Sequence, residues 1–226
     1  MSDAILPVVG GPEDLRRGDQ KKLVYVIDDD SELRRSLHFA LATSQITVWP
    51  FAAPEDFLDQ LDTLEPAPVL LDLRMRTMDG MEVLQRLSER GNRWPIVMFS
   101  AFGDIPVAVR AMKLGALDFV EKPVSLAVLD EILARSFDAL AVAIDNARAA
   151  EDAKTRLARL TPREDEILRL LVKGGSNKLV AHSLGISERT VEIHRSNALK
   201  KLSIKTLTQF ANLILIESSN GYERLN

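Results

Sequence analysis

The chain has 226 residues, of which 46% are hydrophobic and 27% are charged, and its formal net charge at pH 7 is −4. These values are ordinary for a globular protein, and the length allows one large domain or two small ones. The sequence contains no cysteine, which excludes disulfide scaffolds, thiolate zinc sites and cysteine nucleophiles. It also lacks an apolar stretch of the roughly 18 residues that a membrane span requires, so we expect a cytoplasmic protein without a membrane partner.

The charge is unevenly distributed along the chain. Residues 161–226 hold 10 lysines and arginines against 7 acidic residues, whereas residues 1–160 hold 19 against 26. This asymmetry indicates two modules, of which only the second suits a polyanion electrostatically.

The first 21 residues contain three glycines and no hydrophobic periodicity, so we expect a disordered tail over 1–21. A regular alternation then begins, with helical patterns between apolar runs of strand length. The runs occupy residues 23–27, 46–49, 69–71, 96–99 and 117–120, and the helical patterns occupy 31–43, 54–63, 79–90, 105–114 and 125–139. Five such units predict an α/β fold, a doubly wound, five-stranded parallel sheet over residues 22–140.

The helical pattern continues without glycine or proline from 126 to 160, and we expect residues 141–160 to form a helical linker. Leucines and alanines recur there at two heptad positions: Leu126, Leu133, Leu140 and Ala147 at one, and Leu129, Ala143, Ala150 and Leu157 at the other. The middle of this seam is mostly alanine. Two interpretations stay open: a helix that pairs weakly with a second copy of itself, and a solvated linker.

A small all-α domain is predicted over residues 161–226. Thr161, Pro162 and Glu164 have the spacing of an N-cap, a first-turn proline and a capping box. The glycines at 174, 175 and 185 separate the first three of four short helical patterns, which occupy about 162–173, 177–184, 188–202 and 206–218.

Acidic, hydroxyl and basic residues follow the predicted strands of the first domain. Three aspartates, 28–30, follow the first strand, and Asp72, Ser100 and Lys122 end or follow the third, fourth and fifth. Because ligands of an open parallel sheet bind outside the carboxyl ends of its strands, we expect these residues to share one crevice. An aspartate triplet alone is more often a solvated turn or helix cap, so the prediction depends on the joint pattern.

The residue types in this crevice predict phosphoryl chemistry. Carboxylates without cysteine or histidine favour a hard cation, Mg²⁺ or Mn²⁺. A carboxylate beside such a metal can attack a phosphoryl group and form an acyl phosphate, while the metal and a lysine neutralise the transferring oxygens. A hydroxyl side chain can then donate a hydrogen bond to the new phosphoryl group.

Four stretches carry these residues: 24-VYVIDDDSELRRSL-37, 71-LDLRM-75, 96-IVMFSAFGD-104 and 115-GALDFVEKP-123. They resemble the receiver domain of bacterial two-component response regulators, close to the FixJ-like branch, over residues 22–140. The resemblance implies Asp72 as phosphoacceptor and Asp28 and Asp29 as the acidic pair. It implies Asp29, Asp72 and the backbone carbonyl of Arg74 as metal ligands.

The same resemblance makes Ser100 the switch hydroxyl, Phe119 the switch aromatic and Lys122 the phosphoryl-binding lysine. Without it, Phe119 would be assigned to the hydrophobic core. One position departs from the branch: Arg76 stands where a proline is usual, which loosens the loop and adds positive charge near the phosphorylation site.

In the second domain, residues 177–202 have the pattern of a helix-turn-helix, with Val191 and Ala198 on the apolar face of the second helix. Helical hairpins with a few lysines are common, so charge alone is weak support. The stretches 160-LTPREDEILRLL-171, 176-SNKLVAHSLGIS-187 and 190-TVEIHRSNALKKL-202 resemble the LuxR/NarL/FixJ-type DNA-binding domain. The candidate DNA contacts are Lys178, Arg189, Thr190, Glu192, Ile193, His194, Arg195, Ser196, Asn197, Lys200 and Lys201.

The resemblances together predict a response regulator. A sensor histidine kinase would phosphorylate Asp72, after which the protein would form a homodimer and bind promoter DNA. Two alternatives are a Mg²⁺-dependent aspartyl phosphatase and a phosphorylation-controlled module that binds protein rather than DNA. Such phosphatases commonly carry a second acid two residues after the nucleophile, and Arg74 at that position weighs against the first.

Overall fold

The computed structural model describes residues 22–101 and 104–222, and the tail predicted over 1–21 lies outside them. The chain consists of two compact units, Met1–Ala143 and Ile144–Asn226. In the described part of the chain, no helix is long and apolar enough to cross a membrane.

The first unit contains a five-stranded parallel sheet in the order β2-β1-β3-β4-β5, which confirms the predicted fold class. Its strands are β1 (Lys22–Ile27), β2 (Ile46–Phe51), β3 (Val69–Leu71), β4 (Ile96–Ser100) and β5 (Asp118–Glu121). β2 continues two residues beyond its predicted end at residue 49, so that it includes Pro50 and ends at Phe51. A proline is tolerated there because β2 is an edge strand and has no neighbour on one side.

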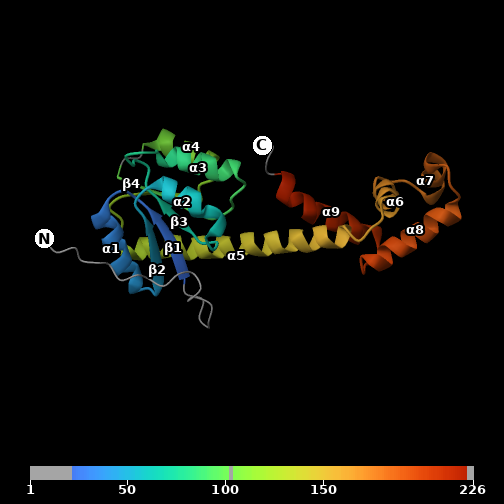
Figure 1. The fold of residues 1–226 in the computed structure, drawn as a ribbon, viewed down its shortest axis with the longest axis horizontal. Coiled ribbons are helices and arrows are strands. Elements are labelled where there is room, and N and C mark those ends of the chain that lie inside the picture. The colour runs from blue at the N-terminus through green and yellow to red at the C-terminus, as the bar shows by residue number, and fades with distance from the viewer. Residues whose placement is uncertain (1–21, 102–103, 223–226) are drawn as a thin grey trace. The chain divides into compact units, whose positions relative to one another are not determined.

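Helices cover both faces of the sheet, because successive strand residues point to opposite sides (Figure 1). Tyr25 and Ile27 of β1 pack with α2 (Pro54–Gln60), its short 3₁₀ continuation η2 (Leu61–Thr63), α3 (Gly80–Glu89) and α4 (Ile105–Lys113). Val24 and Val26 pack on the other face with α1 (Ser31–Ala42) and the first part of α5 (Leu126–Leu157). The valines and the isoleucine among these side chains contribute about 1.5–3 kcal/mol each on full burial, so both faces are strongly held.

The long helix α5 contributes to the cores of both units. Leu129 and Leu133 are buried against the sheet, whereas Ala153 and Leu157 pack in the core of the helical unit. The end of the predicted linker therefore belongs structurally to the second unit. Between 141 and 149 every residue except Ala143 is exposed. Most leucines of the predicted heptad seam thus have packing partners within their own unit.

The second unit is all-helical, as predicted, with α6 (Pro162–Val172), α7 (Asn177–Leu184), α8 (Glu188–Lys201) and α9 (Leu207–Tyr222). Thr161 caps α6 in the predicted capping box, and Ser187 caps α8 through the N–H of Thr190. Gly185 ends α7 with φ 65°, a left-handed conformation that glycine adopts without strain and that makes the turn of the helix-turn-helix.

Candidate phosphorylation site and DNA-binding helix

The structure brings the strand-end residues together as predicted. Lys122, just after β5, places its Nζ 2.7 Å from Oδ2 of Asp28 and 2.6 Å from Oδ1 of Asp72. These residues are far apart in sequence but meet because β1 lies beside β3, and β4 lies between β3 and β5. A single ammonium group thus bridges two carboxylates at the carboxyl edge of the sheet.

The aspartate triplet divides into three local roles. Asp28 is buried, and its Oδ1 accepts the N–H of Asp30 at 2.8 Å. The Arg34 guanidinium of α1 donates to the backbone carbonyl of Asp28. Asp30 is exposed and caps α1, accepting the N–H of Glu32 at 2.8 Å. Asp30 therefore has the structural role that an isolated triplet would suggest, which leaves Asp28 and Asp29 for the crevice.

Asp72 is held rigidly at the end of β3. Its N–H donates to the carbonyl of Ile27 at 2.9 Å, and its Oδ2 accepts the N–H of Arg74 at 2.9 Å. Burial raises the pKa of the Asp72 carboxyl above its ordinary value, and the nearby charge of Asp28 adds to that effect, while the Lys122 ammonium opposes both. The result is a desolvated carboxylate beside a cation, suited to nucleophilic attack.

The loop after Asp72 requires glycine at position 80. A Cβ on Gly80 would lie 2.2 Å from the backbone carbonyl oxygen of Asp72 and 3.0 Å from Cα of Leu73, well inside van der Waals contact. The N–H of Gly80 donates to the carbonyl of Leu73 at 2.8 Å. The start of α3 therefore lies directly against the backbone of the candidate phosphoacceptor, and only a residue without a side chain fits.

The two predicted switch residues lie on neighbouring strands. Ser100 ends β4 and is fully buried, and its carbonyl accepts the N–H of Lys122 at 2.9 Å. Phe119 in β5 is half-buried and packs against the core on the face of α2, α3 and α4. Both the core role and the switch role of Phe119 agree with this position, and its coupling to Ser100 stays a prediction.

Asp29 has a partner that sequence analysis did not anticipate. Its Oδ2 accepts a hydrogen bond from Nε of Arg76 at 3.0 Å, an ion pair between the loops after β1 and β3. The signal in the sequence was the arginine at a position where the resembled branch has proline. Across residues 22–101 and 104–222, no cluster of three or more Asp, Glu, His or Cys side chains is arranged to hold a metal ion.

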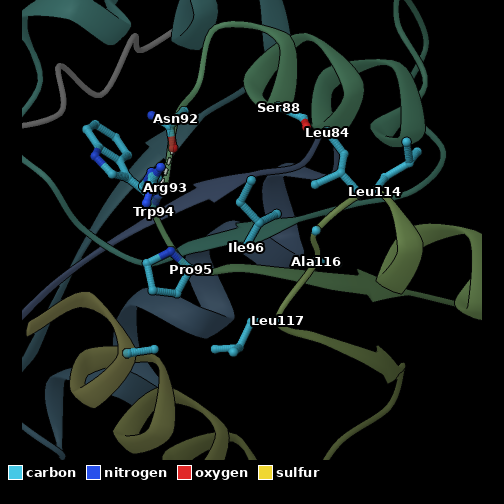
Figure 2. A pocket seen from close by; sticks show the side chains of 12 residues that line it. Leu84, Ser88, Asn92, Arg93, Trp94, Pro95, Ile96, Leu114, Ala116 and Leu117 are labelled. Carbon is cyan, nitrogen blue, oxygen red and sulfur yellow. Dashed lines mark hydrogen bonds between the residues drawn. The ribbon is translucent and has the colours of Figure 1, made fainter. Parts of the chain in front are cut away.

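A separate hollow of about 280 Å³ lies at the opposite edge of the sheet (Figure 2). It is lined by residues at the beginning of β4 and before β5, including Trp94, Ile96 and Leu117. The N–H of Trp94 donates to Oδ1 of Asn92 at 2.8 Å on its rim. No sequence-predicted site residue lines this hollow, and because the strands are parallel it is the amino edge, away from Asp72.

In the second unit, α8 presents most of the predicted DNA contacts to solvent. Its buried side carries Val191 and Ala198, as predicted from the apolar stripe. The exposed candidates are Lys178 of α7 and, on α8, Arg189, Glu192, Ile193, Ser196, Asn197, Lys200 and Lys201. The half-buried candidates are Thr190, His194 and Arg195, and the Thr190 hydroxyl lies 2.8 Å from that of the cap residue Ser187.

Lys201 has a structural partner within its own unit. Its Nζ lies 2.7 Å from Oε2 of Glu164, whose side chain is only 5% exposed. The same oxygen accepts the Thr161 N–H at 2.9 Å. The Lys201 ammonium and the hydrogen bonds of Thr161 outweigh burial and hold the pKa of Glu164 below its ordinary value. Lys201 thus links the end of α8 to the capping box of α6, a role that its position in a lysine pair did not reveal.

The comparisons with known proteins agree with both units. Residues 24–134 match the response regulator receiver domain, and residues 158–214 match the bacterial regulatory proteins of the luxR family. The transcriptional regulatory protein FixJ of Bradyrhizobium diazoefficiens is 38% identical over 192 residues, which cover 85% of this chain and 94% of FixJ.

Two solved structures align along nearly their whole length. The response regulator StyR is 33% identical with a TM-score of 0.69, and the alignment covers 88% of this chain and 99% of StyR. Full-length FixJ from B. japonicum is 37% identical with a TM-score of 0.54, and the alignment covers 88% of this chain and 98% of FixJ.

The matches also distinguish between the alternatives. A receiver domain implies a histidine kinase as phosphoryl donor, and this domain family generally uses Mg²⁺ at its phosphorylation site. A luxR-family domain implies DNA binding. The relatives are regulators rather than enzymes, which argues against the phosphatase interpretation. The chain therefore belongs to the FixJ-like response regulators, transcriptional regulators that join a receiver domain to a LuxR-family DNA-binding domain.

Proposed function

We propose that Asp72 is the residue that accepts the phosphoryl group from the kinase. The observation that carries this assignment is the double contact of Lys122 Nζ with Asp72 and Asp28 at 2.6 and 2.7 Å. In the transfer, an oxygen of the Asp72 carboxylate forms a bond to phosphorus while the bond from phosphorus to the kinase histidine nitrogen breaks. The Lys122 ammonium lies where it can neutralise charge on the transferring oxygens.

The donor types at this edge suit a hard divalent cation, although the three carboxylates of the described residues are not arranged as a complete metal cluster. Asp28, Asp29 and Asp72 supply carboxylate oxygens, and the carbonyl of Arg74 supplies a neutral one. Support comes from the two carboxylates that already share one cationic nitrogen at hydrogen-bonding distance. When bound, Mg²⁺ or Mn²⁺ would supply further positive charge to the phosphoryl oxygens. Asp28 and Lys122 meanwhile keep the Asp72 carboxylate oriented.

The signal would leave the site through Ser100 and Phe119. The Ser100 hydroxyl, at the carboxyl end of β4 beside β5, is suited to donate a hydrogen bond to a phosphoryl group on Asp72. A shift of Ser100 toward the phosphoryl group would open space for Phe119, which is only half-buried. Phosphorylation would in this way change the surface near α4 and β5 and raise the homodimer population.

A dimer would place two copies of α8 on two DNA half-sites, as helix-turn-helix proteins generally do. The exposed polar residues of α8 would contact base edges, and Lys178 and Lys200 would contact phosphates. Light scattering of the full chain with and without beryllofluoride tests the dimer step. We expect the mass to increase toward twice the monomer, and an unchanged mass at tens of micromolar protein would contradict this step.

Labelling by radioactive acetyl phosphate in Mg²⁺ tests the acceptor assignment. Asp72→Asn should abolish labelling, because the amide keeps the shape of the carboxylate but is not a nucleophile. Asp118→Asn is the matched control, since Asp118 is an acid of the same sheet that begins β5, at the other end of that strand from Lys122. Full labelling of Asp72→Asn, with circular dichroism like that of the parent, would refute the assignment.

A further inference from the structure

Every carboxylate of the candidate metal site already has a basic partner from this chain. Asp28 and Asp72 share Lys122, and Asp29 is paired with Arg76 at 3.0 Å. The two kinds of pair differ in burial. The Lys122 side chain is only 15% exposed, whereas that of Arg76 is 82% exposed and that of Asp29 is 25% exposed. Arg76 can therefore move into solvent at little cost, and Lys122 cannot.

The Arg76–Asp29 pair and a metal ion at Asp29 oppose each other. Oδ2 of Asp29 uses one lone pair to accept the hydrogen bond from the guanidinium, and that lone pair is not available to a cation. A divalent ion a few ångströms from the guanidinium would also repel it, with twice the force between two unit charges. A metal ion bound through Asp29 therefore weakens the ion pair and favours release of the guanidinium into solvent.

We propose that Arg76 is an internal competitor of the divalent cation: its guanidinium occupies Asp29 in the metal-free receiver, lowers the metal affinity, and is released when the cation binds. This inference rests on the proposed function, because it requires Asp29 to be a metal ligand. Arg76 is a positioning residue here, acting on the metal only through Asp29. The effect belongs to this chain, since a proline at position 76 could make no such pair.

The expected size of the effect follows from the exposure of the pair. Exposed ion pairs contribute little, and the remaining repulsion acts through water, so we expect Arg76→Gln to tighten metal binding by about threefold to tenfold. Because Arg76 is exposed and both contributions act through water, added salt should reduce the difference. A buried competitor would change the affinity far more and would be insensitive to salt.

The test measures binding of Mn²⁺ alone to the full-length, unphosphorylated protein, with free Mn²⁺ counted by electron paramagnetic resonance. The variants are Arg76→Gln, Asp29→Ala and the double variant. Arg135→Gln is the matched control, because it removes an exposed arginine paired with Asp118 on β5, at the other end of that strand from Lys122. Each is measured at about 20 and about 300 mM KCl, where screening differs strongly.

We expect Arg76→Gln to tighten Mn²⁺ binding at low salt and Arg135→Gln to leave the affinity within about 1.5-fold of the parent. The gain from Arg76→Gln should vanish in the double variant, in which Asp29 is alanine. An unchanged or weaker affinity of Arg76→Gln would overturn the proposal, as would an equal gain in both arginine variants or a gain that persists without Asp29. If Asp29→Ala itself binds Mn²⁺ as the parent does, the metal site of the proposed function fails instead.

Discussion

Substitution of Lys201 distinguishes a structural role from a DNA contact. The sequence predicts both Lys200 and Lys201 as DNA contacts, and a lysine ammonium suits a phosphate. In the structure Lys201 Nζ lies 2.7 Å from the buried Oε2 of Glu164, whereas Lys200 is exposed and no ion pair is recorded for it among the described residues. We therefore expect Lys201→Met to destabilise the helical unit and Lys200→Met to leave its stability unchanged.

The magnitude follows from what the Glu164 carboxylate loses. Removing one partner of a fully buried ion pair costs about 3–5 kcal/mol, and a hydrogen bond to a charged group contributes about 1.5–3 kcal/mol. The Lys201 side chain is 41% exposed, and Glu164 keeps its hydrogen bonds from Thr161, so the lower range applies. We expect a loss of about 2 kcal/mol, which corresponds to a roughly 30-fold increase in the opening constant of α6.

Hydrogen exchange of the full chain measures this opening directly. The amides of Ile167 and Leu168, in the buried part of α6, should exchange about 30-fold faster in Lys201→Met and within about twofold of the parent in Lys200→Met. A double-mutant cycle with Glu164→Gln should assign the loss to this pair. Unchanged exchange in Lys201→Met, together with a DNA salt dependence flattened by about one unit, would refute the structural role and restore the phosphate contact.

Three further predictions follow from the site and from α8. Gly80→Ala should greatly slow labelling by acetyl phosphate, because its Cβ would meet the Asp72 carbonyl at 2.2 Å, and labelling at the parent rate would contradict that packing. Since the pKa of the Asp72 carboxyl is raised in the folded state, the folded protein holds the proton more tightly, and stability falls as pH rises from about 4 through the raised pKa. Asp72→Asn should therefore raise the midpoint of urea unfolding at pH 7.5 but not below pH about 4. Unfolding is followed by the fluorescence of Trp49 and Trp94, the two tryptophans of the chain, and equal midpoints of parent and variant at pH 7.5 would contradict the prediction. Ser196→Ala should change the discrimination between bases at one base pair by about 1–3 kcal/mol, whereas Lys200→Ala should weaken binding to all DNA sequences alike. A uniform loss of affinity in Ser196→Ala would instead place Ser196 against the DNA backbone.

The sequence was most informative where local physics decides the structure. The Thr161 capping box and the glycine break at position 185 each depend on a few neighbouring residues, and both lie where they were expected. Every strand also ends within two residues of its predicted end. The meeting of Asp28, Asp72 and Lys122 also follows from the fold class, because every strand of a parallel sheet ends at the same edge.

Contacts between distant, exposed loops were not predictable. Asp29 and Arg76 are 47 residues apart, and nothing in either loop specifies that their side chains meet. The heptad pattern of α5 left two interpretations open, and neither is tested by a single copy of the chain. An apolar repeat shows that a helix is covered but not by what, and Leu133 and Leu157 are covered by the cores of their own units.

We expect phosphorylation of Asp72 to control DNA binding, and the affinity for DNA measured with and without phosphorylation tests this expectation. A fragment selected from random DNA by the phosphorylated protein serves as the probe, at one fixed salt concentration. We predict that acetyl phosphate with Mg²⁺ tightens binding of the parent by about tenfold or more and leaves Asp72→Asn unchanged. Equal affinity of the parent in both states, or an equal gain in Asp72→Asn, would show that phosphorylation of Asp72 does not control DNA binding.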